Sequence, residues 1–176
     1  MELSQVAANA KASATLSLNA KAKELASQGV DVVMFTVGEP DFPTPENICQ
    51  AAIRAIQAGF TRYTPAAGMP ELRKAVAEKF KRDNDLDYAP EQVIVSNGGK
   101  HSLYQTLLAL VQAGDEVLIP APYWVSYVDQ VEICGATPAI IDCTTREDLK
   151  LTPEMLRQAI TPRSRLLMLN YPSNPT

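Results

Sequence analysis

The chain has 176 residues, of which 46% are hydrophobic and 20% are charged, and a formal net charge of -4 at pH 7. This composition is typical of a globular domain with one sizeable core. The mild acidity argues against nucleic-acid binders and anionic-membrane binders, because both need a basic face.

Hydrophobic periodicity predicts alternating elements over most of the chain. In chain order these are a helix over 18–28, a strand over 32–38, helices over 46–59 and 70–84, a strand over 92–96, a helix over 101–114, a strand over 116–122, a helix over 126–135, a strand over 136–142, a short helix over 153–160 and a strand over 165–170.

Several predicted helix ends carry residues typical of helix caps and turns. Gly29 is placed to close the first helix. The turn-rich segment 39–45 (EPDFPTP) leads into Thr44 as an N-cap and Pro45 as the first helical residue. The expected strands are nearly continuous apolar runs, as in sheets covered on both faces. Strands alternating with helices therefore predict an α/β fold with a mostly parallel sheet.

The stretch SNGGKHSLYQ (96–105) lies where a strand is expected to end and a helix to begin. Ligands of parallel sheets bind at the carboxyl ends of strands. Gly98 and Gly99 would let backbone amides at a helix N-terminus approach an anion, with Lys100 as a further donor. The alternative is a plain tight turn. A phosphate-binding P-loop is excluded because it needs glycine where Ile94 stands. The dinucleotide-binding motif G-x-G-x-x-G is also absent, which argues against a nicotinamide or flavin dinucleotide site of the usual kind.

Three other junctions carry suitable chemistry, each with a structural alternative. Tyr123, Trp124 and Tyr127 follow the strand over 116–122, where an aromatic group could stack on a flat ring or fill the core. Asn174 follows the last strand and could project its amide into the same crevice or form an ordinary Asx turn. Gly38 could offer a backbone amide or simply make a turn.

Taken together, VGEPDFPTP, YTPAAGMPELR, VSNGGKHSLYQ, PAPYWVSY and NYPSNPT resemble the class I aminotransferases, which are pyridoxal-phosphate enzymes of the aspartate aminotransferase fold. The resemblance is strongest to the subgroup that contains many bacterial aspartate aminotransferases. It extends over essentially all 176 residues.

The resemblance implies a role for each junction. Gly98, Gly99 and Lys100 would hold the phosphate of pyridoxal 5'-phosphate, and Trp124 would stack on its ring. Asn174 would bond the phenolic oxygen and help to seat the substrate carboxylate.

Two further residues gain a role from the same resemblance. Gly38 would lie against the substrate carboxylate. Tyr63 would reach the cofactor phosphate of a partner subunit, which implies a homodimer with shared active sites.

The implied reaction is transamination between an amino acid and a 2-oxo acid, with aspartate and 2-oxoglutarate as the favoured pair. Aromatic amino acids and prephenate are the nearest alternatives, followed by a pyridoxal-phosphate lyase of the same fold. An effector-sensing module fused to a DNA-binding domain would need a helix-turn-helix or basic segment before residue 32, which is not seen. A nucleotide-binding α/β domain would be protected thermally by nucleotide rather than by pyridoxal phosphate.

The chain ends shortly after an apolar strand, so a fragment is expected. By resemblance, residues 1–43 form an N-terminal arm and part of a small domain, and residues 44–176 form the first part of the large domain. The lysine that holds the cofactor as a Schiff base would lie beyond residue 176, so the isolated fragment should be inactive. Lys100 is rejected as its substitute because it would meet the phosphate rather than the aldehyde.

The remaining polar groups have simpler interpretations. His101 is interpreted as a first-turn helix residue, and Glu39 and Asp41 as turn and capping groups. A single histidine argues against a histidine-based metal site. The three widely spaced cysteines, Cys49, Cys134 and Cys143, predict reduced thiols in a cytoplasmic protein. No signal peptide or membrane span is expected.

Overall fold

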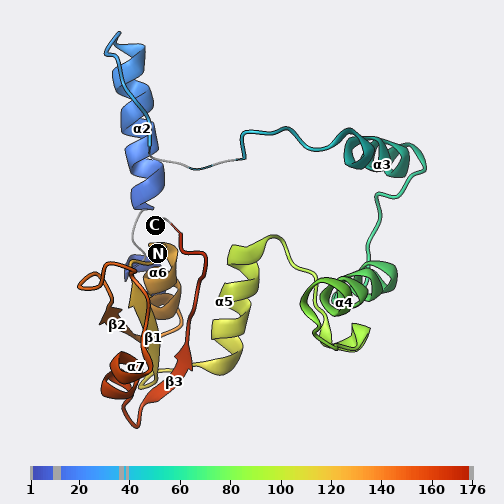
Figure 1. Ribbon diagram of the computed structural model, residues 1–176. Helices are drawn as coiled ribbons and strands as arrows, with labels where there is room; N and C mark the ends of the chain where they lie inside the picture. The colour runs from blue at the N-terminus through green and yellow to red at the C-terminus, as the bar shows by residue number, and fades with distance from the viewer. Residues whose placement is uncertain (1, 10–12, 36–37, 39, 175–176) are drawn as a thin grey trace. The chain divides into compact units, whose positions relative to one another are not determined.

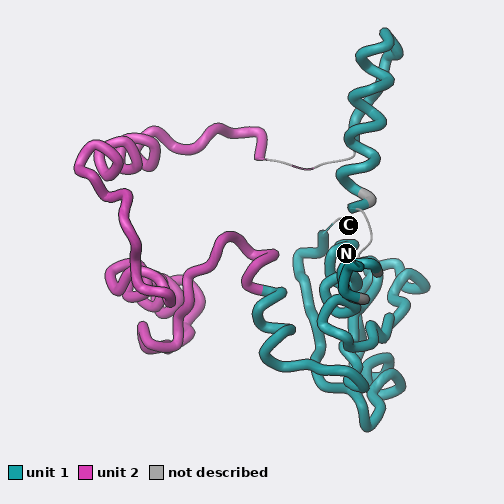
Figure 2. Tube along the Cα trace, turned by 180° about the vertical axis from the view of Figure 1, so that it is seen from behind, with its two compact units in different colours: residues 1–37, 103–176 teal, residues 38–102 magenta. Residues whose placement is uncertain are grey.

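The structure is a computed structural model that describes residues 2–9, 13–35, 38 and 40–174. The chain divides into two compact units. One contains residues 1–37 and 103–176, and the other contains residues 38–102 (Figure 2).

The elements in chain order are shown in Figure 1. They are α1 (Gln5–Asn9), α2 (Ala14–Ser27), α3 (Glu46–Gln57), α4 (Pro70–Asn84), a 3-10 turn (Pro90–Gln92), α5 (Gly99–Leu110), β1 (Glu116–Ala121), α6 (Ser126–Ile133), β2 (Thr137–Asp142), α7 (Pro153–Ala159) and β3 (Ser164–Leu167). The last three predicted strands and all six predicted helices are present, although their ends differ by a few residues. α1 was not predicted.

The first unit contains a parallel sheet with the strand order β2-β1-β3. Leu118 at the centre of β1 pairs with Ala139 of β2 and Leu167 of β3. The predicted α/β class and parallel sheet are therefore confirmed.

β1 is the central strand, and its two faces are covered by different helices. Val117 and Ile119 lie on one face within a core that includes Leu107 of α5 and Val131 of α6, and all four are almost fully buried. Leu118 lies on the other face with the α7 side chains Met155 and Leu156, together with Cys143. This two-sided burial explains why β1 is a continuous apolar run.

A buried acid joins β1 to the segment that enters β3. Glu116 is 5% exposed, and its carboxylate accepts a hydrogen bond of 2.6 Å from the Thr161 hydroxyl. The Arg163 guanidinium lies 2.5 Å from the same carboxylate. The Glu116 amide also donates to the Arg163 carbonyl at 2.8 Å. Both strands are therefore tied together at their amino ends.

The second unit contains α3 and α4. α4 matches the predicted helix 70–84, with Pro70 in its first turn and Asp85 in the left-handed conformation after its last residue. The α3 positions predicted to form an apolar stripe, Ile48, Ala52 and Ile56, are all exposed. The stripe is present in the sequence, but within the described chain no α3 residue is buried.

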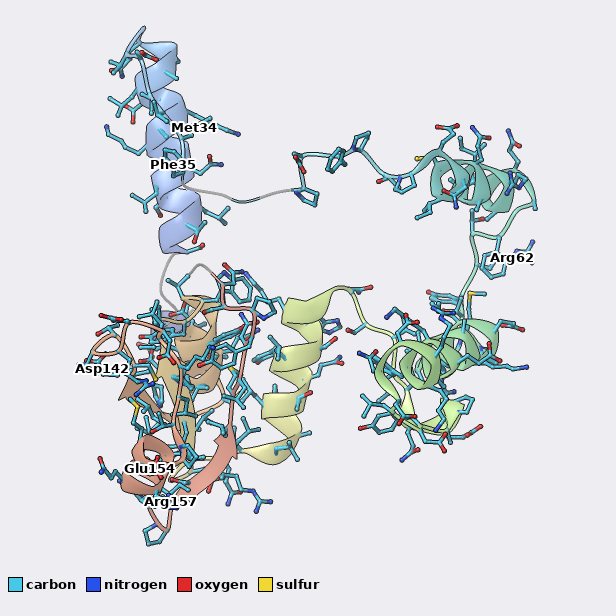
Figure 3. All side chains as sticks on the ribbon, in the orientation of Figure 1. Met34, Phe35, Arg62, Asp142, Glu154 and Arg157 are labelled. Atoms are coloured by element: carbon cyan, nitrogen blue, oxygen red, sulfur yellow. The ribbon has the colours of Figure 1, made fainter. Side chains whose placement is uncertain are left out.

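Two predicted strands are not formed. Residues 32–35 are irregular, with Met34 and Phe35 52% and 92% exposed (Figure 3), and the rest of that prediction includes residues that lie outside the described ones. Residues 93–96 are also irregular, although Val93 has extended dihedral angles. A strand needs a neighbouring strand to pair with, and the sheet of the described residues consists of β2, β1 and β3 and includes neither segment.

Two helix starts also differ from expectation. α2 begins earlier than predicted because Ser13 caps it, accepting a hydrogen bond from the Leu16 amide at 3.3 Å. At α3 the N-cap is Pro45 rather than Thr44, and no side chain caps the helix. Thr44 uses its carbonyl to accept a bond from the Cys49 thiol at 3.6 Å. Among the described helices, none has the length and apolar character needed to cross a membrane.

Candidate cofactor site

A pocket in the first unit lies where β1 and β3 end. The chain after β1 contributes Pro122 and Tyr123, and the chain after β3 contributes Asn170 and Asn174. Because the two strands are parallel neighbours, their carboxyl ends share one edge of the sheet, which is the usual position for ligands in this class of fold. Aromatic and carboxamide groups therefore line the same pocket.

Trp124 is held beside this pocket by α6. Its ring packs edge-to-face on Tyr127, with centroids 5.6 Å apart and an interplanar angle of 87°. Tyr127 is buried in the main core and lines the pocket. Both alternatives for Trp124 therefore have a basis, since its partly buried ring packs on the core at the edge where a flat ligand could stack.

The loop after β3 places Asn174. Pairing continues one residue past β3, because the Met168 amide donates to the Leu118 carbonyl at 2.9 Å. The Tyr171 hydroxyl then accepts a bond of 3.2 Å from the Leu151 amide. These two contacts anchor the loop, and Asn174 is exposed at the pocket wall.

The glycine turn lies in the second unit. Gly98 has φ +86°, a conformation that L side chains rarely adopt, and α5 begins at Gly99. The His101 and Ser102 amides donate to the Gly98 carbonyl at 3.1 and 3.2 Å. Among the described residues the Gly99 amide donates to no other group, and a Cβ at Gly98 or Gly99 would meet nothing within 4 Å. The turn therefore offers a donor and open space.

The other described candidates of the second unit are exposed, except for His101, which is half-buried. Tyr63 is fully exposed, and Gly38 borders open space. His101 lies in the first turn of α5 and its Nδ1 accepts the Asn97 amide bond at 3.2 Å, which agrees with a local helix role. Lys100 is also in that first turn. Asp41 lies in a bend, whereas Glu39 lies outside the described residues.

The structure thus brings Asn174 and Trp124 to one edge of the sheet in the first unit. It places Gly98, Gly99 and Lys100 together in the turn of the second unit. Sequence reasoning did not single out Asn170, which lines the pocket. Its position at the carboxyl end of the predicted strand 165–170 was the available signal.

Asp142 is a charged group at the end of β2 (Figure 3). Hydrogen bonds from the side chain and backbone of Thr144, at 2.5 and 2.9 Å, lower the pKa of the Asp142 carboxyl. The carboxylate is thus ionised and already bonded at neutral pH. The two hydrogen bonds stabilise the turn after β2, and the ionised Asp142 carboxylate is a poor proton donor.

Comparison with known proteins gives consistent relatives. The profile of the family described as aminotransferase class I and II matches residues 30–176. The chain belongs to this family. It is 52% identical over 174 residues to an aspartate/prephenate aminotransferase of Cereibacter sphaeroides, covering 99% of this chain and 44% of that protein. It is 48% identical over 176 residues to an aspartate aminotransferase of Geobacillus stearothermophilus, covering 100% of this chain and 45% of the relative.

Solved structures of the aminotransferase family share the fold. The aspartate aminotransferase of Thermus thermophilus with maleate superposes with a TM-score of 0.95 at 48% identity, covering 100% of this chain and 46% of that one. The chain therefore spans less than half the length of the relatives it matches. The class I aminotransferase resemblance seen in the motifs is confirmed.

The family implies pyridoxal phosphate, and the described residues suit its parts. An anionic phosphate suits the Gly99 amide and the open space at the glycine turn. A flat aromatic ring suits the Trp124 and Tyr127 edge, and a phenolic oxygen suits a carboxamide donor such as that of Asn174. Each part of the cofactor thus has a chemically matched group among the described residues of this chain.

Proposed function

We propose that the full-length protein transfers an amino group between an amino acid and a 2-oxo acid with pyridoxal 5'-phosphate as cofactor. The observation that carries the proposal is the aromatic and carboxamide pocket at the β1 and β3 ends, in a chain of this family. When bound, the cofactor supplies an electron sink for the reaction. Residues of this chain bind and orient it.

The predicted site residues divide the binding tasks in this proposal, and Asn174 also helps to seat the substrate carboxylate. The turn of Gly98, Gly99 and Lys100 binds the phosphate, Trp124 stacks on the ring, and Asn174 donates to the phenolic oxygen. The resemblance assigns Gly38 to the substrate carboxylate. Each assignment is supported by the chemistry of the groups described above.

Aspartate with 2-oxoglutarate is the proposed substrate pair, supported by relatives named aspartate aminotransferase. Prephenate is the second candidate because other relatives, at 52% and 50% identity, are named aspartate/prephenate aminotransferases. Aspartate, 2-oxoglutarate and prephenate are all dicarboxylic acids that carry an amino or oxo group, so they present similar groups to the site.

The experiment is a coupled assay on purified full-length protein. We expect oxaloacetate release from aspartate that depends on 2-oxoglutarate and on added pyridoxal phosphate, with prephenate tested as the alternative amino-group acceptor. The isolated 176-residue chain serves as the inactive control. Release of ammonia in place of amino-group transfer would identify a lyase, and a protein that takes up no pyridoxal phosphate would refute the proposal.

Replacing Asn174 by alanine tests the ring contact. A hydrogen bond to the deprotonated phenolic oxygen favours that form, so its loss raises the pH at which the bound cofactor changes absorbance. We expect an upward shift of about one to two pH units, since a hydrogen bond to a charged group contributes about 1.5–3 kcal/mol. A spectral titration of the full-length variant that matches the wild type would contradict the assignment.

We also propose a homodimer in which Tyr63 of one subunit reaches the cofactor phosphate of the other. The support is the family resemblance together with the complete exposure of Tyr63 in this chain. A full-length protein that sediments as a monomer while holding its cofactor would contradict the shared site.

A further inference from the structure

The motif YTPAAGMPELR contains more than the tyrosine that was assigned a role. The loop and helix that follow Tyr63 hold the segment that leads into the glycine turn, and all of these residues belong to the second unit. We infer that Gly68 and Arg73 are positioning residues for the phosphate-binding turn at 96–100. The inference rests on the proposed function, which assigns the phosphate to that turn.

The first contact is between the loop and Val95. The Val95 amide donates to the Ala67 carbonyl at 3.0 Å. Gly68 has φ +102°, and a Cβ built on it would lie 2.7 Å from both Cβ and Cγ2 of Val95. Real Cβ atoms essentially never approach so closely. Because the obstacle includes the Val95 Cβ, which moves only with its backbone, a side chain at position 68 must displace the chain directly before Ser96.

The second contact comes from α4. The Arg73 Nε–H is shared between the carbonyls of Pro90 and Val93, at 2.9 Å each. Arg73 is partly buried, so these bonds are only partly exposed to competition from water. They fix both ends of the 90–93 segment against α4. Gly68 and Arg73 thus act on adjoining parts of the same approach to the turn.

The contacts of Gly68 and Arg73 determine the direction in which the turn amides point. The Gly98 amide donates to the Ser96 carbonyl at 2.9 Å, and the hydroxyls of Ser96 and Ser102 lie in contact. The turn is therefore built directly on the residue that follows Val95. A displaced Val95 would misdirect the Gly99 amide, which has no acceptor among the described residues.

The test compares pyridoxal phosphate with pyridoxal, which lacks the phosphate, on full-length protein by equilibrium dialysis. Wild type should bind pyridoxal phosphate much more tightly. For Gly68→Ala we expect the affinity for pyridoxal phosphate to fall roughly tenfold to hundredfold, with less than about a threefold change for pyridoxal. Gly29→Ala is the matched control, because Gly29 has φ +82° but open space around it.

A second variant covers the case in which Gly68→Ala does not fold. Arg73→Met keeps the aliphatic stem and removes the donor. The affinity for pyridoxal phosphate should fall about tenfold, while the affinity for pyridoxal should stay unchanged. Amide hydrogen exchange over residues 96–102 should be faster in the cofactor-free variant than in the cofactor-free wild type. Lys74→Met is its control, since Lys74 lies on the same helix and makes an exposed ion pair with Glu78.

The outcomes separate the two proposals. If wild type binds pyridoxal phosphate no better than pyridoxal, the phosphate role of the turn fails, and the inference fails with it. If wild type discriminates but Gly68→Ala and Arg73→Met weaken both ligands equally, the proposed function survives and the positioning role is overturned. A loss confined to pyridoxal phosphate establishes the positioning role.

Discussion

Replacing Gly98 by valine should lower the affinity of the full-length protein for pyridoxal phosphate roughly tenfold to hundredfold, because a strained backbone residue costs about 1–3 kcal/mol. The native φ of +86° is a genuine outlier for a β-branched residue. The turn would relax away from the geometry that aims its amides at an anion. Titration of the apoprotein with cofactor, followed by absorbance, measures the change.

Gly114→Val is the control for this substitution. Gly114 has φ +96° and open space around it, and it lies in the loop between α5 and β1. The two variants should lose similar amounts of thermal stability, but only Gly98→Val should lose cofactor. Equal cofactor affinities for the two variants would contradict the proposal that the glycine turn binds the cofactor.

Replacing Leu107 by alanine should have the largest effect on folding. Leu107 is 1% exposed and packs in the core between α5 and the sheet. Deleting a buried leucine side chain leaves a cavity and costs about 2–5 kcal/mol of unfolding free energy. Urea denaturation of the full-length protein, followed by circular dichroism, measures the loss.

The neighbouring leucine provides a matched control. Leu108 is 54% exposed on the same helix, so Leu108→Ala should cost less than about 1 kcal/mol. A cost as large as that of Leu107→Ala would mean that another part of the full-length polypeptide covers this side of α5. Equal small costs for both variants would contradict the core position of Leu107.

Elements defined by local chemistry were predicted well from the sequence. α4 has Pro70 at its start, a helical apolar spacing and a residue in the left-handed conformation at its end, and the apolar runs of β1 and β2 reflect burial on the sheet. The runs at 32–38 and 92–96 have similar local character, yet the described part of each forms no strand. Pairing depends on a neighbour that can be distant in sequence, so the pattern alone could not decide.

The site could be predicted only in part for the same reason. The rule that parallel strands end at one edge correctly indicated that the segments after β1 and β3 would meet. The Gly68 contact with Val95 and the two Arg73 bonds join residues 17 to 27 positions apart and leave no periodic trace. Such contacts become visible only when the backbone path is known.

The buried Glu116 also bears on how accurately the distant pocket is built. If β3 slipped by one residue, the buried Glu116 carboxylate would lose its contacts with the Thr161 hydroxyl and the exposed Arg163 guanidinium. Leaving a buried acceptor unsatisfied costs about 1–3 kcal/mol, and more when the group is charged. The same slip would carry the chain beyond β3 about 3.3 Å along the strand and invert its faces. The contacts of Glu116 at the amino ends of the strands therefore help to fix the register of β3 against β1. That register determines where Asn174 lies at the carboxyl ends.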